Sequence, residues 1–207
     1  MSSFLISEAQ ANLLREWRKQ WNLAEGAMKI AEKTNEVFQA PSVQELHYSG
    51  RKVVEFLDLI ETPSLVHSPD DKLKDAIYDC HRARHDASDH ASSVISERLD
   101  TARPQFGADA VRQVFPEYAE LVAELADVRE IIAESREKRN GRGEFYTKIE
   151  ADHLPKIMKL YEKFKVSEPE LENGYIRRLF TEFGVRYGWL IAILLAVLAW
   201  LYPRTPG

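Results

Sequence analysis

The chain has 207 residues, of which 29% are charged and 44% hydrophobic, and its formal net charge is −5. This length fits one ordinary domain with an appendage, and the acidic balance gives no overall attraction to nucleic acid or to anionic lipid. The single cysteine, Cys80, excludes an intramolecular disulfide and with it the small disulfide-stapled secreted scaffolds.

The first two predicted helices cover residues 7–38 and 42–60. In the first helix, apolar side chains recur every three or four positions after an initial serine, which is a good capping residue. Pro41 is expected to end this helix. Ser42 and Glu45 then stand at the spacing of a capping box, which predicts the start of the second helix.

A third helix has the clearest start signal in the chain. Ser68 is a capping residue, Pro69 stands at the first helical position and Asp71 adds an acid in the first turn. Helical spacing of apolar residues continues to about Leu99. A loop is then expected over residues 101–107, which contain a proline.

The fourth predicted helix opens at Pro116 and closes with a basic turn before Asn140 and Gly141, as a helix C-terminus should. Four apolar residues in it alternate four and three positions apart: Leu121, Leu125, Val128 and Ile132. These four residues form an apolar seam along one side of the helix. The seam is shorter than three heptads, so it favours packing inside one bundle over a coiled coil between chains.

A fifth helix is predicted over residues 144–164, with a bend or interruption near Pro155, and a sixth begins near Pro169. No stretch shows the period-two alternation that is typical of strands. The sequence therefore predicts an all-α protein: a cytosolic helical bundle of about five long helices over residues 1–168, followed by a membrane helix.

The C-terminal segment predicts a membrane span. From Tyr187 to Tyr202 the chain is apolar without a charged residue, and aromatic side chains stand near both ends: Tyr187, Trp189, Trp200 and Tyr202. Aromatic anchors at both ends are typical of a helix that crosses a bilayer. At roughly 24 Å, this stretch alone is slightly short of the ~30 Å hydrocarbon layer, so a buried core helix is the alternative.

The flanking charges predict the orientation of the span. Arg177, Arg178 and Arg186 precede it and only Arg204 follows it, which places the N-terminal side in the cytoplasm. The N-terminal residues lack the basic start and long apolar run of a signal peptide. We therefore expect a single-pass, tail-anchored protein, in the inner membrane if the source is bacterial. The amphipathic juxtamembrane helix would cover 169–186, the span 187–203 and a short tail 204–207.

Small residues lie along one side of the predicted span. Gly184 and Gly188 are four positions apart and Ala192 continues the stripe, which allows two helices to approach closely in lipid. The expected partners are therefore the lipid bilayer, further copies of the chain in a homo-oligomer, and a protein partner on the cytosolic face. No cofactor is expected.

The unusual polar segment runs from Cys80 to His90. If it is helical, His81, His85 and Asp89 lie on roughly one face and form a weak candidate metal site, which would need a further ligand. The alternative is a solvated helix face. No Gly-rich phosphate loop and no nucleophile elbow occurs in the chain.

The same segment contains Arg84-His85, then four residues, then His90. This Arg-x(4–6)-His pattern in an all-helical context resembles the motif of HEPN ribonucleases, and the combination with a membrane span is similar to some membrane-associated HEPN-like antiviral accessory proteins. The resemblance implies that Arg84 and His90 form a metal-independent catalytic pair with His85 beside them, acting on RNA across a dimer.

Two functions therefore remain in competition. The first is a tail-anchored protein whose helical cytosolic domain acts at the membrane by self-association or by binding a partner, with a membrane-perturbing antiviral or stress effector as the setting that the resemblance suggests. The second is a membrane-tethered HEPN-like ribonuclease. We favour the first, because the span rests on a longer stretch of sequence than the Arg-His pattern does.

Overall fold

The computed structural model describes residues 6–35, 40–63, 66–138 and 141–201. The elements in these ranges are helical and no strand occurs among them, so the predicted all-α fold is confirmed. In chain order they are α1 (Glu8–Asn35), α2 (Ala40–Glu61), α3 (Pro69–Phe106), α4 (Ala108–Val114), α5 (Tyr118–Glu137), α6 (Arg142–Lys148), the π-helical turn η1 (Ile149–His153) and α7 (Leu154–Leu201).

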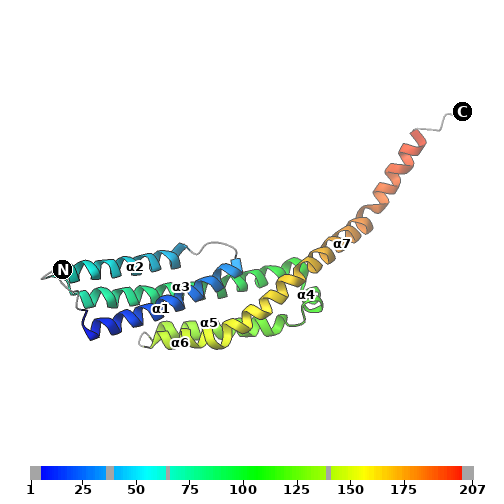
Figure 1. Cartoon of the computed structure of the whole chain (residues 1–207). Helices are drawn as coiled ribbons and strands as arrows, with labels where there is room; N and C mark the ends of the chain where they lie inside the picture. The colour runs from blue at the N-terminus through cyan, green and yellow to red at the C-terminus, as the bar shows by residue number, and fades with distance from the viewer. Residues whose placement is uncertain (1–5, 36–39, 64–65, 139–140, 202–207) are drawn as a thin grey trace.

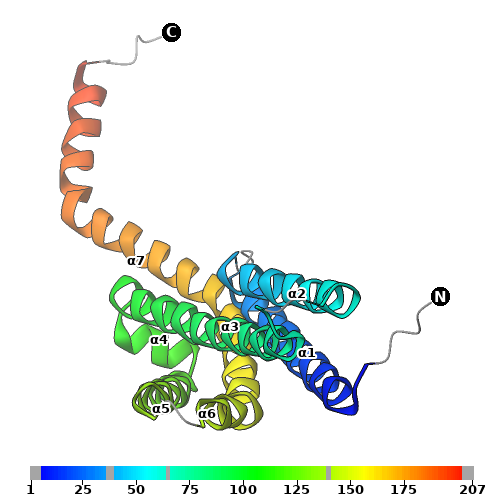
Figure 2. The ribbon, with the colours of Figure 1, turned by 90° about the vertical axis from the view of Figure 1, so that its left-hand side faces the viewer.

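The long helix α3 is the centre of the bundle, as the end-on view in Figure 2 shows. Helices α1 and α2 pack along one side of it, and α5 with α6 lies on another side. Where α1 meets α3, the buried side chains are mostly alanines: Ala24, Ala27, Ala31, Ala83, Ala87 and Ala91. Such small residues let the two backbones approach closely.

A second core of larger side chains joins the C-terminal half of α3 to α4, α5 and the first part of α7. Its largest buried members are aromatic and aliphatic: Phe115, Tyr146, Tyr161, Phe164, Ile95, Leu99, Leu154 and Ile157. The four residues of the predicted seam on α5 are also buried in this core. The interpretation of that seam as packing within one chain is therefore confirmed.

Helix α7 leaves the bundle and continues far beyond it (Figure 1). Its first part is packed in the core through Leu160 and Phe164, and Leu171 is its last buried residue. We predicted a new helix near Pro169, but α7 passes through that proline without a break. Bundle and tail therefore share one continuous helix.

Two further boundary predictions were wrong. Pro41 lies in the first turn of α2, where a missing N–H costs nothing, and Ser42 is a buried residue inside that helix rather than its cap. Helix α3 does not end near Leu99 but runs to Phe106 with Pro104 inside it. Burial of Ala102 and Phe106 in the second core offsets the hydrogen bond that this proline removes.

The start signals of α1 and α3 were predicted correctly. Ser7 and Gln10 form a reciprocal cap: the Ser7 hydroxyl accepts from the Gln10 N–H at 3.2 Å, and the Gln10 side chain accepts from the Ser7 N–H at 3.0 Å. Ser68 is the N-cap residue of α3 and Pro69 follows at its first position. Helix α4 was missed because seven residues are too few to show a period.

The predicted interruption near Pro155 takes the form of the π-helical turn η1. Proline has no N–H, so Pro155 cannot donate to the carbonyl of Ala151. The backbone widens there, and the Leu154 N–H donates to the Ile149 carbonyl, five residues back. This turn directs Glu150 toward α3 and His153 toward α5, where each meets a charged partner.

Candidate functional site

The C-terminal half of α7 is an apolar helix with no protein packed on it. Large hydrophobic side chains are exposed around it, among them Phe180, Phe183, Ile191, Leu194, Leu195 and Leu198. Among the described residues this is the one helix long and apolar enough to cross a membrane, and its apolar window is 0% buried. A continuous apolar surface of this kind marks an interaction site rather than a core element. This segment is therefore not a core helix buried within the chain itself.

The predicted anchors fall at the two ends of this segment. Tyr187 and Trp189 lie at its start and Trp200 lies near its end with 80% of its surface exposed, while Tyr202 lies outside the described residues. The Trp189 indole donates to the Arg186 carbonyl at 3.1 Å. Exposed aromatic rings at both ends, Tyr187 and Trp189 at the start and Trp200 near the end, suit the interfacial zones of a bilayer.

The juxtamembrane arginines are exposed just before the anchors. Arg178 pairs with Glu182 at 2.8 Å, and the Arg186 guanidinium lies over the Tyr187 ring at 5.9 Å. Side chains added at Gly184 or Gly188 would meet nothing within 4 Å. The predicted small-residue face, which Ala192 continues, is therefore open in the isolated chain.

The Arg-His segment of α3 forms part of a polar cluster inside the bundle. Arg84 is only 3% exposed. Its guanidinium makes a two-pronged ion pair with Glu150 of η1, with both N–O distances at 2.7 Å, and also donates to the Thr147 hydroxyl at 3.2 Å. The Ser88 hydroxyl donates to the same carboxylate at 3.3 Å. This geometry is typical of a strong charge-assisted pair.

His85, next to Arg84, and Asp89, about one turn further along α3, contact Tyr146 of α6. The His85 ring stacks on Tyr146 with centroids 3.8 Å apart. The Tyr146 hydroxyl donates to Asp89 at 2.7 Å, and Arg136 of α5 pairs with the other oxygen of Asp89 at 3.3 Å. Burial raises the pKa of Tyr146 to about 12, and its hydrogen bond to Asp89 adds to this. The phenol therefore stays protonated and donating.

The structure pairs Arg84 with Glu150 rather than with His90. The His90 side chain is half-buried, and its Nε2 has no hydrogen-bond partner within the described part of the chain. Six positions along a helix turn two side chains about 120° apart. Arg84 and His90 of one copy therefore do not converge, so a composite site would need a second copy.

The predicted metal ligands on α3 do not come together. The ring centroids of His81 and His85 are 6.1 Å apart, Asp89 is engaged by Tyr146 and Arg136, and these three do not form a group of close ligand atoms among the described residues. The interpretation as a solvated face is also wrong for Arg84 and His85, because both side chains are buried.

A different group could hold a metal ion. Ligand atoms of Glu124, Asp127 and His153 lie within 4.8 Å of one another at the crossing of α5 and η1, the one such group of three among the described residues. Lys156, however, already lies 2.7 Å from one oxygen of Glu124, and His153 lies 3.1 Å from the other. These pairs account for the cluster without a metal.

Sequence reasoning missed Glu150 and Tyr146, the two residues that hold the segment 84–89 in place. They lie 66 and 57 positions along the chain from the residues they bind. No local pattern marks either one, since a glutamate and a tyrosine at helical spacing are ordinary surface residues.

Comparison of the whole chain with protein-family models, with curated proteins and with solved structures found no match in any of the three.

The burial of His85 makes the stability of the bundle depend on pH. Burial first, and then the positive charges of Arg142, His81 and Arg84, lower the pKa of His85 to about 3 from an ordinary 6.5. Between these values the unfolded chain binds a proton that the folded chain does not, so stability falls as pH falls below 6.5. Going from pH 7.5 to pH 5 should therefore cost about 2 kcal/mol through this residue.

The check is chemical denaturation of the wild type and of His85→Phe at both pH values. Phenylalanine keeps a ring against Tyr146 but cannot titrate, so the variant should lose about 2 kcal/mol less than the wild type on acidification. Every other titrating group is common to the two proteins. Equal losses would contradict the assignment of His85 as a neutral buried histidine.

Proposed function

We propose that this protein is a membrane-anchored helical bundle that acts at the membrane surface by associating with itself or with a protein partner. The observation that carries the proposal is the continuity of α7: one helix is packed in the bundle as far as Leu171 and is apolar and unpacked from Phe183 onward. A continuous helix therefore joins the bundle directly to the segment that we place in the bilayer.

In the proposed arrangement the bundle faces the cytoplasm. Arg177, Arg178 and Arg186 are all exposed on the bundle side of the apolar segment, within reach of phosphate headgroups. With the guanidinium of Arg186 extended back toward the headgroups, the apolar segment can begin near Phe183. A helix from Phe183 to Leu201 is about 28 Å long, which suits the ~30 Å hydrocarbon layer.

Self-association would use the open face at Gly184, Gly188 and Ala192. Two helices that meet at glycines four positions apart gain backbone contact that larger side chains prevent. No Asp, Glu, Lys or Arg lies between Tyr187 and Leu201, so a single copy offers no polar path for ions.

Fractionation tests the anchor. The full chain should pellet with membranes and resist extraction by alkaline carbonate, whereas a variant that lacks residues 184–207 should be soluble, with the helices of its bundle intact by circular dichroism. Protease added to intact cells or spheroplasts should leave the bundle uncut if it faces the cytoplasm. A full chain that carbonate extracts would overturn the proposal.

Glycine substitutions test the self-association. Gly184→Leu/Gly188→Leu should shift the detergent-solubilised protein toward a monomer by analytical ultracentrifugation, since leucine keeps the segment apolar but blocks close approach. Gly174→Leu is the matched control, because Gly174 is also an open helical glycine but lies in the polar part of α7. If both variants keep the oligomeric state of the wild type, the glycine face is not the interface.

The ribonuclease alternative stays a prediction, and it requires a change in the ion pair between Arg84 and Glu150. Arg84 would have to leave Glu150, or Glu150 would have to be neutralised, before this guanidinium could bind a phosphate. The polar cluster as it stands is accounted for by the packing of α3 against η1.

A further inference from the structure

A basic hollow lies between α3, the end of α5 and the start of α6. It has a volume of about 570 Å³, within the range of small-molecule sites in proteins. Arg82, Arg136 and Arg142 line it together with His81 and His85, and no carboxylate lines it among the described residues. Three guanidinium groups therefore converge on one hollow, and the carboxylates that interact with them, Glu45, Asp86 and Asp89, are not among the residues that line it.

Two residues that line this hollow each have a buried nitrogen without a hydrogen-bond partner among the described residues. His85 is 6% exposed and lines the hollow, yet its Nε2 has no hydrogen-bond partner in the described ranges. The buried Nε of Arg142 is also without a partner there. Buried polar atoms are rarely left unpaired, because each one costs free energy, so two in one hollow point to a ligand that bonds them.

Arg142 differs from the other two arginines in making no ion pair among the described residues, although the Asp86 carboxylate interacts with its charge from further away. Arg82 pairs with Glu45 at 2.7 Å and Arg136 pairs with Asp89 at 3.3 Å. Arg142 lies over the Tyr146 ring, 5.6 Å from its centroid, and has no ion pair among the residues that the structure describes. An anion would therefore gain most from Arg142, the one of the three arginines that no ion pair holds within the described residues.

The shape of the hollow also fits an anion with an attached ring. Gly143 lines the hollow, and a Cβ there would meet only His81, at 3.9 Å. The Tyr78 ring at the rim is 63% exposed and can stack on a flat group. A lone phosphate would leave much of the 570 Å³ empty, whereas a nucleotide would fill it.

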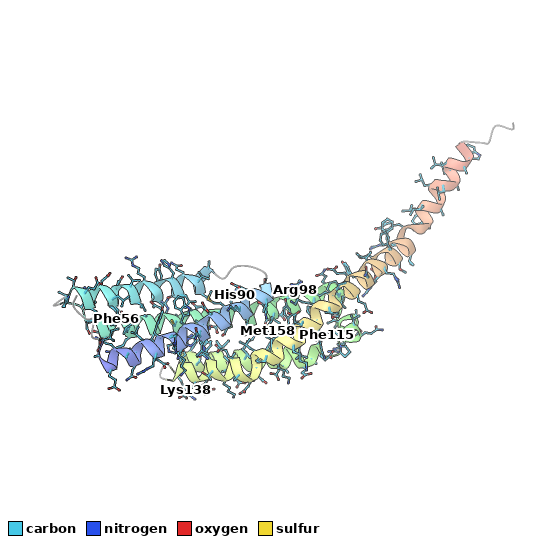
Figure 3. All side chains as sticks on the ribbon, in the orientation of Figure 1. Phe56, His90, Arg98, Phe115, Lys138 and Met158 are labelled. Carbon is cyan, nitrogen blue, oxygen red and sulfur yellow. The ribbon has the colours of Figure 1, made fainter. Side chains whose placement is uncertain are left out.

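The position of the hollow excludes a lipid headgroup. Lys138, the last described residue before Gly141 and α6, lies on the far side of the bundle from the C-terminal helix (Figure 3). From Arg142 to Phe183 the helix rises about 60 Å. A ligand in this hollow is therefore drawn from solution and not from the membrane.

We propose that this hollow binds a soluble nucleotide, with its phosphates on Arg142 and Arg136, a hydrogen bond to His85 Nε2, and its base on Tyr78. The site is independent of the membrane anchor, so binding and anchoring can succeed or fail separately.

Calorimetric titration of the full chain in detergent tests the site, with ATP and inorganic phosphate as probes. ATP should bind, and phosphate should compete with it more weakly. Arg142→Gln should weaken ATP binding by at least about tenfold, the loss expected for a charge-assisted pair, and Arg112→Gln, at an exposed arginine on α4, should change it by less than about twofold.

Two more variants separate the parts of the site. Gly143→Leu fills the hollow without removing a charge, so it should abolish binding. Leucine has a higher helix propensity than glycine, so the substitution should not destabilise α6. Tyr78→Ala should weaken ATP but leave phosphate unchanged. Absence of ATP binding at millimolar concentration, or equal binding by Arg142→Gln and the wild type, would overturn the proposal. So would Arg142-dependent binding of single-stranded RNA without binding of ATP.

Discussion

Replacing Leu194 by arginine is expected to release the protein from membranes. Leu194 lies near the middle of the apolar half of α7 and is 59% exposed, so the new charge would face lipid. An arginine at the centre of a membrane helix costs about 2.5–3.5 kcal/mol relative to neutral insertion, and replacing a favourable leucine adds to this. A span of this length has little excess apolar area, so we expect the carbonate-resistant fraction to fall at least about tenfold.

The matched control is Val166→Arg. Val166 is also an exposed aliphatic residue of α7, with 81% of its surface accessible, but it lies on the part that packs in the bundle. This substitution should leave both membrane association and thermal stability unchanged. If Leu194→Arg stays in the membrane pellet as the wild type does, the apolar half of α7 is not the anchor, and its exposed face must be covered by protein instead.

How far the sequence predicts the fold depends on the length of each pattern. The period of apolar residues predicts the long helices α1, α3 and α5, because each repeats over several turns. Pro104 and Pro169 were both expected at a break between helices, and the prediction failed at both for the same reason. Each proline removes one backbone hydrogen bond, but the nearby residues Phe106 and Leu171 are buried, and their packing keeps the helix intact. Local propensity loses to tertiary packing at both sites.

For the polar cluster around Arg84, in contrast, the sequence does not predict which residues come into contact. The spacing of Arg84, His85 and Asp89 on α3 is visible in the sequence, but their partners Tyr146 and Glu150 come from a segment more than fifty residues away. Which face of α3 that segment covers depends on the path through α4 and α5. Sequence reasoning therefore finds the unusual residues and not their surroundings, which decide whether they are solvated or buried.

Removing one partner of the Arg84–Glu150 pair is expected to produce the largest loss of stability in the bundle. Arg84→Met leaves a carboxylate that is largely buried and uncompensated, which costs about 3–5 kcal/mol when a buried pair is broken from one side. Arg98→Met is the matched control: Arg98 makes the same two-pronged pair with Glu168, whose side chain is 20% exposed against 16% for Glu150, but the Arg98 side chain is 48% exposed against 4% for Arg84, so removing it opens the remaining carboxylate to water. That variant should lose less than about 1 kcal/mol, as exposed pairs do.

The double variant Arg84→Met/Glu150→Leu should recover most of the loss, because apolar residues of similar size replace both charges and leave neither unpaired. Urea denaturation of the four proteins gives the comparison directly. A double variant as unstable as Arg84→Met would show that Ser88 and Thr147, which share the network, contribute more than the ion pair.

A folded double variant also tests the ribonuclease alternative. It lacks Arg84 yet keeps the bundle, so an RNA-cleaving activity that survives in it cannot use the Arg84–His90 pair. Loss of such an activity in this folded protein would instead be the result that the ribonuclease alternative requires.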